Sequence, residues 1–385
     1  MKESLRAQAF NSRKPQNNIP GKNYETNRIL SIDVLRGFDM FLIIFADSFF
    51  NSLHCGFGTP FTEFLAIQFR HPEWLGSTFY DIVMPLFLFV VGAVIPFSLS
   101  KEVLESTGKV QLYKKLLKRF LVLFILGWIV QGNLLAFDLE KFSIFSNTLQ
   151  AIAVGYLFSC IAYIHLKRKW LFVIFGGCLV IYALLLTITT IPAAGHGELL
   201  PDSNFAMYFD RLVLGEFQDG TQYTWLLSSF GFIATTLSGL FAGELIKSKL
   251  PRTKVALYLF LAGIAGITLG LILGIWHPII KKIWTSSFVL ASSGACFLLM
   301  ALFYWIIDVK EYRKWTLLFK IIGMNAITAY VLSHVINFNT VGHFLLFGLE
   351  QYVGGFYWMI QVIGGSFLLM LILWHMYKYK IFIKV

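Results

Sequence analysis

Charged residues are scarce in this chain. Only 14% of its 385 residues are Asp, Glu, Lys or Arg, whereas 57% are hydrophobic, 39 of them are Phe, and the mean hydropathy is +0.69. A soluble domain carries about a quarter of its residues as charges, so this composition excludes one. It predicts an all-α, polytopic membrane helix bundle, because helices satisfy their own backbone hydrogen bonds within lipid.

Cysteine is also scarce. The four cysteines, Cys55, Cys160, Cys178 and Cys296, show no CxxC and no Cys/His spacing, and three of them lie inside apolar runs. They are typical of small core or lipid-facing residues rather than disulfides or metal ligands. The sequence therefore predicts no metal site.

The first 28 residues lack an apolar stretch, so we expect no cleavable signal peptide and expect the first span to direct insertion. They are predicted to form a basic cytoplasmic tail, followed by a single transmembrane domain over 29–385. The chain also lacks a basic stretch interleaved with exposed aromatics, which argues against nucleic-acid binding. Its net charge of +11 is better explained by cytoplasmic loops.

Apolar segments long enough to cross about 30 Å of hydrocarbon recur along the whole chain. They predict about ten transmembrane helices, near 30–52, 79–99, 116–135, 145–165, 170–191, 225–246, 254–275, 286–307, 316–337 and 354–377. The segment 341–350 is too short to cross on its own, which leaves an eleventh pass open.

Loop charges set the expected orientation, because Lys and Arg accumulate in short cytoplasmic loops. With the N-terminus inside, 26 of the 32 Lys and Arg fall in inside segments, five in outside segments, and Arg36 in the first span. Both termini are therefore predicted to be cytoplasmic. The only long outside loops are then 51–78 and 192–224.

The first predicted span carries four ionisable residues, which are costly within lipid. On an ideal α-helix Asp33, Arg36, Asp39 and Asp47 share one face, which should point into the bundle. Asp33, Arg36 and Asp39 could form an ion-pair ladder that fixes packing, or bind a polar or anionic ligand. Asp47 has no adjacent cation, so we expect either a partner on another helix or the behaviour of a general base.

A polar stretch, RHPEWLGSTFYD, precedes the second span and can fold back over the mouth of the first. A neutral imidazole at His71 could take a proton from a nucleophile or carry an acyl group. A carboxylate such as Asp81 would orient that imidazole. We expect His334, within the ninth span, to be a second-rank candidate.

Three further polar clusters lie within predicted spans: 147–150, 284–294 and 322–334. Their small and hydroxyl residues favour close helix packing. For Gln150 and Asn325, whose amides need partners in hydrocarbon, packing and a ligand-lined cavity are equally open.

Two of these motifs resemble a known family. SIDVLRGFDMFLIIF, with Asp33, Arg36 and Gly37, and HPEWLGSTFYD, with His71, Trp74, Gly76, Thr78 and Asp81, are similar to the start of the transmembrane acyltransferases typified by heparan-alpha-glucosaminide N-acetyltransferase. The likeness continues through TLQAIAVGYLF, IWTSSFVL and IGMNAITAYVLSH. It covers about residues 29 to 337.

The resemblance implies a central catalytic histidine and transfer of an acetyl group from cytosolic acetyl-CoA to an amino group of glucosamine on the far side. It leaves open an acetyl-histidine intermediate or direct transfer. Animal members carry Asn at the position of Asp47 and Arg at that of Ala151, so acceptor and acyl donor could differ. We expect a bacterial inner-membrane enzyme acting on amino sugars or their oligosaccharides, with a homodimer permitted but not specified.

The predicted roles follow from these motifs and from the resemblance. Catalytic roles fall to His71 and Asp47; substrate or CoA contacts to Arg36, Asp39, Trp74, Asp81, Gln150, Trp284, Asn325 and His334; and structural roles to Asp33, Gly37 and Gly76. The alternative is a proton-coupled transporter of a sugar or organic anion, since buried carboxylates suit both functions. A histidine in an outer loop beside Trp74 and Asp81 favours the enzyme.

Overall fold

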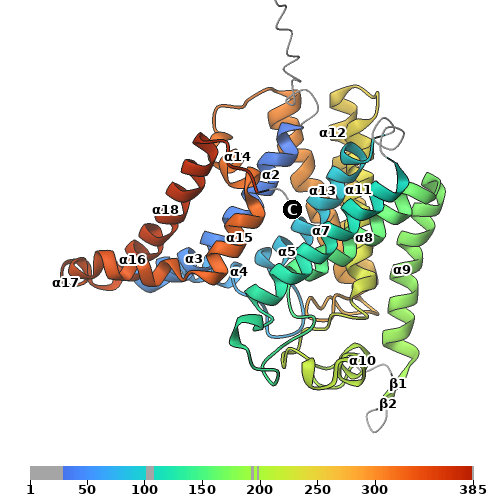
Figure 1. Ribbon diagram of the computed structural model, residues 1–385, viewed down its shortest axis with the longest axis horizontal. Helices are drawn as coiled ribbons and strands as arrows, with labels where there is room; N and C mark the ends of the chain where they lie inside the picture. Colours follow the sequence, from blue (N-terminus) through green and yellow to red (C-terminus); the bar gives the residue numbers. More distant parts are fainter. Residues whose placement is uncertain (1–28, 101–107, 192–194, 197–198, 384–385) are drawn as a thin grey trace, which may run out of the picture.

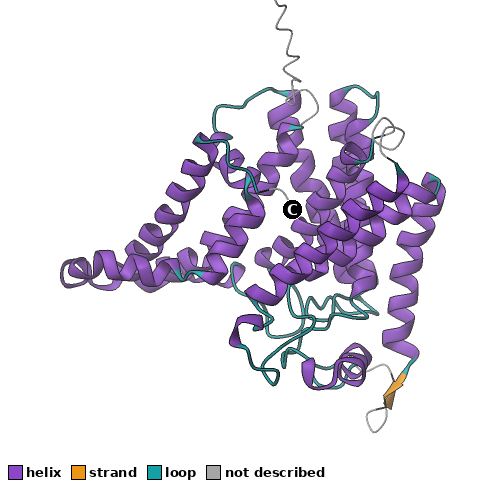
Figure 2. Ribbon diagram, viewed as in Figure 1, coloured by secondary structure: helices purple, strands orange, loops and turns teal. Residues whose placement is uncertain are grey.

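A computed structural model describes residues 29–100, 108–191, 195–196 and 199–383. Within them the chain is helical apart from its loops and one pair of two-residue strands, β1 (Thr190–Ile191) and β2 (Gly195–His196) (Figure 2). The all-α prediction is confirmed. The predicted tail 1–28 lies outside the described residues.

Helices occupy every predicted span. The long ones are α5 (Val83–Ser98), α7 (Lys109–Val130), α8 (Thr148–His165), α9 (Arg168–Ile188), α11 (Ser229–Lys247), α12 (Arg252–Gly274), α13 (Ser286–Tyr304) and α18 (Tyr357–Lys378). Shorter elements are α4 (Pro60–Gln68), η2 (Phe79–Ile82), η3 (Leu134–Ala136), α10 (Phe205–Leu214), η4 (Gly215–Phe217), η5 (Trp305–Val309), α16 (Phe338–Leu346), η6 (Phe347–Leu349), α17 (Glu350–Val353) and η7 (Gly354–Phe356).

Seven helical segments of the described residues are long and apolar enough to cross a membrane, and an eighth follows if one bent pair counts as a span. That bent pair is α14 (Leu317–Met324) and α15 (Ala326–Val335), which meet at 77°. Neither the first helix nor α7 is among these segments, and α7 carries a cluster of four cations, Lys114, Lys115, Lys118 and Arg119. The protein is thus a multi-pass membrane protein, and the count of ten spans stays a prediction.

The first predicted span is one continuous helix in three parts: α2 (Leu30–Phe41), the π-helical η1 (Leu42–Ala46) and α3 (Asp47–Phe57). A π-helix closes its hydrogen bonds from residue i to i+5, so each residue turns the chain less than in an α-helix. The prediction that Arg36 and Asp47 share one face assumed ideal α-geometry. The intervening η1 makes that assumption wrong.

Glycines set how closely the central helices approach. A Cβ on Gly37 would lie 1.7 Å from the carbonyl oxygen of Phe319, and one on Gly323 would lie 2.2 Å from that of Asp33. Helices α2 and α14 therefore pack backbone against backbone, as small residues permit in membranes. The structural role predicted for Gly37 agrees with this contact.

The loops gather at the two ends of the bundle. The segments that precede α9, α12 and α14 lie at one end, and those that precede α5, α8, α11 and α13 lie at the other (Figure 1). This is the alternation that the loop charges predicted. Helices α16 and α18 pack against each other beside α3 and form an arm to one side (Figure 1).

Candidate active site

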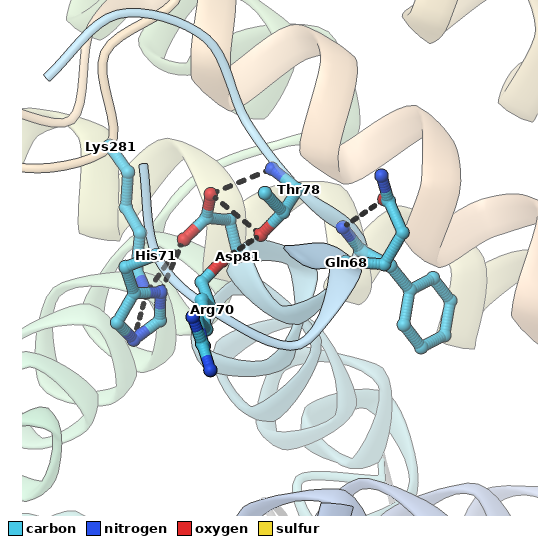
Figure 3. Close-up of polar contacts among 7 residues, drawn as sticks. Gln68, Arg70, His71, Thr78, Asp81 and Lys281 are labelled. Atoms are coloured by element: carbon cyan, nitrogen blue, oxygen red, sulfur yellow. Dashed lines mark hydrogen bonds and ion pairs between the residues drawn. The ribbon is translucent and has the colours of Figure 1, made fainter. Parts of the chain in front are cut away.

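The side chains of His71 and Asp81 are in contact, in the segment that leads into α5. The imidazole Nδ1 of His71 lies 2.6 Å from Asp81 Oδ1, and Asp81 is fully buried (Figure 3). The other carboxylate oxygen accepts a hydrogen bond from the backbone N–H of Thr78 at 2.9 Å. Asp81 is thus fixed at the start of η2 as a capping residue, so it can orient the ring as expected.

Lys281 completes this cluster, and no sequence argument singled it out. It comes from the loop between α12 and α13, and its Nζ lies 3.2 Å from Asp81 Oδ1. The same Nζ lies 3.1 Å from His71 Nδ1 and 3.3 Å from Nε2 (Figure 3). Burial lowers the pKa of Lys281, and the charge of Asp81 acts in the opposite direction.

A backbone contact holds the two loops together. The N–H of Gly76 donates to Ile279 O at 2.9 Å, and Gly76 forms a bridge with Ile280, next to Lys281 in the chain. Gly76 has φ +90°, a conformation that side chains disfavour. Trp74 packs in the same region and donates its indole N–H to Leu199 O at 2.7 Å. Gly76 and Trp74 therefore position the His71 loop, and Trp74 does not line the cavity.

His71 and Lys281 line an outer cavity of about 300 Å³. His334, predicted as a second-rank candidate, lies on the same cavity, with its Nδ1 2.9 Å from Tyr330 O. Other polar and aromatic lining residues are Tyr80, Gln131, Ser146, Asn147, Thr148, Asp219, Thr221, Tyr223, Trp225 and Tyr330. A cavity of this size with a few converging polar groups suits a small polar ligand.

Asp47 lies beside the His71 cluster rather than on the cavity lining. Its Oδ1 accepts a hydrogen bond from Asn51 Nδ2 at 2.7 Å, and Arg70 Nε donates to Asn51 Oδ1. His71 and Arg70 both act electrostatically on Asp47. The expected partner on another helix is therefore not the one observed: Asp47 bonds an amide on its own helix, which is backed by an arginine of the next loop.

Cavities at the opposite end of the bundle contain arginines. One, of about 430 Å³, is lined by Arg36, Arg119 and Ser98, and a second, of about 290 Å³, shares Arg36 and Ser98 and adds Asp33. The guanidinium of Arg119 lies 4.2 Å from the ring centre of Tyr156. Its Nε is buried and has no hydrogen-bond partner within the described residues. Such a free donor fits an anionic ligand.

The outer cavity and the arginine-lined cavity follow one another along the same three helices. On α5 the lining passes from Met84 to Phe87, and on α8 from Thr148 to Ile152. On α15 it passes from Tyr330 to Ile327. Residues three or four apart are separated by one helical turn, about 5.4 Å. Only a thin layer of side chains therefore divides the two cavities.

The predicted ion-pair ladder forms only in part. Arg36 NH1 lies 3.4 Å from Asp33 Oδ1. Asp39 is fully buried, and neither carboxylate oxygen has a hydrogen-bond partner within the described residues. The predicted ion pair between Asp39 and Arg36 is therefore wrong. Asp39 also lines none of the cavities described above.

Three other residues that were predicted to contact the ligand instead contact groups of the protein itself. Gln150 bonds the backbone of Ile144 and Ser146, at 2.8 Å in each case. Trp284 is buried, with its indole N–H 3.3 Å from Thr235 Oγ1. Asn325 lies at the break between α14 and α15, and its amide reaches Ile381 O at 3.2 Å. In each case the protein itself supplies the partners for the buried polar group.

Comparison with known proteins points to one family. The chain is 24% identical to heparan-alpha-glucosaminide N-acetyltransferase of Mus musculus and 25% identical to that of Homo sapiens, over 93% and 79% of its own length. It spans 61% and 52% of the length of these relatives. The family profile described as "Heparan-alpha-glucosaminide N-acetyltransferase, catalytic" matches residues 28–259. Because that match covers more than half of the chain, the protein belongs to the heparan-alpha-glucosaminide N-acetyltransferase catalytic family.

Proposed function

We propose that the protein transfers an acetyl group from cytosolic acetyl-CoA to the amino group of glucosamine or a related amino sugar on the opposite side of the membrane. The observation that carries this proposal is the tandem of cavities. The outer cavity contains His71 backed by Asp81, and the inner one contains Arg36 and Arg119. One layer of side chains separates them, so donor and acceptor could meet while neither crosses.

The inner cavity is suited to the donor. CoA carries phosphates, which a guanidinium recognises through several N–H groups at once. Arg119 has a buried N–H without a partner within the described residues, and Arg36 lines both cavities at this end. The basic loops near them are those predicted to face the cytoplasm, where acetyl-CoA is available. This orientation, with both termini cytoplasmic and the protein in a bacterial inner membrane, forms part of the proposal.

His71 is suited to general-base catalysis. If its Nδ1–H donates to Asp81, Nε2 keeps a lone pair that can accept a proton. As the acceptor amine attacks the thioester, a C–N bond forms and the C–S bond breaks. The amine proton passes to Nε2 and then to the departing CoA thiolate. If Nε2 instead attacks the thioester carbonyl first, the C–S bond breaks, the CoA thiolate leaves and an acetyl-imidazole forms; the amine then attacks this acetyl group and releases the imidazole.

A thiol-release assay tests the proposal. Purified protein in detergent is given acetyl-CoA and a panel of amino sugars, and free CoA is measured. We expect release that depends on an amino sugar and is lost in His71→Ala, by about 10² or more. Retained turnover in a folded His71→Ala protein would remove the central role of His71. Accumulation of labelled sugar in proteoliposomes without acetyl-CoA would instead support the transporter alternative.

A further inference from the structure

Lys281 is almost completely buried, although it lies in a loop. Its side chain is 8% exposed, and the carboxylate of Asp81 beside it is fully buried. An isolated ammonium would be very costly in such surroundings, but a paired and hydrogen-bonded one is tolerated. A neutral side chain could fill the same space, so the presence of a charge beside His71 calls for a chemical reason.

The position of the ammonium relative to the imidazole supplies one. Its Nζ is nearly equidistant from the two ring nitrogens, at 3.1 and 3.3 Å. The lone pairs of Nδ1 and Nε2 point in different directions, so one amine at similar distance from both is not aligned with either. Lys281 therefore acts on His71 mainly through its charge, and this leaves Nε2 available.

Among the three groups in direct contact, Asp81, Lys281 and His71, the charges balance only when the imidazole is neutral. Asp81 contributes one negative charge and Lys281 one positive charge, and both are buried, so a protonated His71, whose side chain is 38% exposed, would leave a net positive charge on these three groups. Without Lys281, Asp81 alone would favour the imidazolium, which is neither a base nor a nucleophile. The groups that face His71 are Asp81, Tyr80, Lys281, Asp47 and Arg70, and, across the cavity, Asp219, Tyr223 and His334.

We propose that Lys281 is a positioning residue whose ammonium charge opposes protonation of His71 and so favours the reactive, neutral imidazole. This proposal rests on the proposed role of His71 in acetyl transfer. The contact that places Lys281 is the bridge between Gly76 and Ile280, which joins the His71 loop to the α12–α13 loop.

The test measures the imidazole itself, not acetyl transfer. Diethyl pyrocarbonate reacts with neutral imidazole, so the modification rate of the peptide that contains His71, followed by mass spectrometry across pH, gives the protonation curve of that ring. In Lys281→Met we expect the curve to move to higher pH by about one pH unit or more, since one charge at 3.1 to 3.3 Å is removed. In Lys281→Arg, which keeps the charge, the curve should stay near that of the wild type.

An electrostatic role of Lys281 makes a second prediction that a packing role of the same residue would not make. Asp81→Asn leaves the lysine charge uncompensated, so its curve should move to lower pH. Lys281→Met combined with Asp81→Asn restores neutrality, so its curve should return toward that of the wild type. Lys282→Met is the matched control, because the adjacent Lys282 bonds Gln222 Oε1 at 2.8 Å instead of His71.

Coincident curves for Lys281→Met and wild type, or a shift of Lys281→Arg as large as that of Lys281→Met, would overturn the proposal. If Lys281→Met does not fold, Lys281→Gln, which also removes the charge, takes its place, and a curve that coincides with that of the wild type overturns the proposal. Since no acyl donor or acceptor is used, these results are independent of whether the proposed acetyl transfer occurs. The thiol-release assay tests that transfer separately.

Discussion

Asp47 and His71 lie near one another but are held in different ways. His71 is bonded to a buried carboxylate in the next element, whereas Asp47 bonds Asn51 one turn along its own helix. Arg70 reaches Asn51 from the loop, so Asp47, Asn51 and Arg70 form a polar row next to the histidine. Asp47 is thereby a charged neighbour of His71 rather than a lining residue of the outer cavity.

Asp47→Asn should lower the rate of CoA release by about 10²-fold and shift its pH optimum, because it removes a carboxylate charge that acts on His71. The volume of the side chain is almost unchanged, so folding should be preserved. Initial rates across pH provide the measurement. Glu63→Gln, an exposed carboxylate in α4, is the control and should leave the profile as it is. A wild-type profile in Asp47→Asn would reduce Asp47 to a packing role.

At the scale of single residues, the sequence predicted the site residues that are unusual near an apolar span. It missed a residue that joins the site only through a contact between distant parts of the chain. His71 and Asp81 were predicted because ionisable groups beside an apolar run are unusual. Lys281 was treated as one of five outside loop charges, and nothing in its local sequence shows that the chain folds it onto His71, 210 residues away. The scarcity of outside lysines was the only available signal.

The first helix shows what periodicity can and cannot predict at the scale of an element. Its apolar length and its N-terminal half were predictable, whereas the close approach of Gly37 to the backbone of Phe319 was not, although a structural role was predicted for this glycine. The π-helical segment 42–46 was not predictable either, because an insertion of this kind leaves no mark in a simple 100° wheel. Burial of Asp39 inside the bundle was expected, but the absence of a hydrogen-bond partner for its carboxylate within the described residues was not, and the break at Asn325 was missed as well, since tertiary packing decides both.

Gly37→Ala should destabilise the protein strongly. Its Cβ would lie 1.7 Å from the backbone oxygen of Phe319, which cannot move without shifting α14. Overpacking of this type costs about 1–3 kcal/mol or more. Gly176→Ala in α9 is the matched control, because its Cβ would meet nothing within 4 Å. Thermal unfolding in detergent should show a lower midpoint for the first variant only, and equal midpoints would argue against close packing of α2 on α14.

Asp210 in α10 should make the stability of the folded protein depend on pH. Burial raises its pKa to about 7, although the backbone N–H groups of Trp225 and Leu226 donate to it. The folded state then holds a proton that the unfolded state releases near pH 4. Stability should therefore fall as pH rises from about 4 to 7, by at most about 1.4 kcal/mol per pH unit, and level off above. Asp210→Asn should reduce this slope in thermal unfolding measured across pH, and an unchanged slope would contradict the assignment.

On the scale of the whole molecule, the helices place two chemically different cavities in line. The outer one combines His71, Lys281 and aromatic rings, while the inner one combines arginines with apolar walls. The loop charges predicted which loops share an end of the bundle, and the fold agrees. The cavities themselves could not be predicted, because they depend on how α5, α8 and α15 pack together.

This arrangement predicts that transfer has a direction across the membrane. In sealed proteoliposomes with a known orientation of the protein, acetyl-CoA should support acetylation of an amino sugar only from the side of Arg36 and Arg119, with the sugar on the other side. Equal rates from both sides would contradict separate entrances for donor and acceptor.

Filling the layer between the cavities tests the same arrangement in detergent. Ile152 is 1% exposed and lines the inner cavity on α8, so Ile152→Trp should obstruct passage of the acetyl group and abolish CoA release. Modification of His71 by diethyl pyrocarbonate from the outer cavity should persist, since that entrance stays open. Ile161→Trp on the same helix, at a site 36% exposed, should leave both readouts unchanged. Full transfer in a folded Ile152→Trp protein would mean that the acetyl group reaches His71 without passing from the inner cavity.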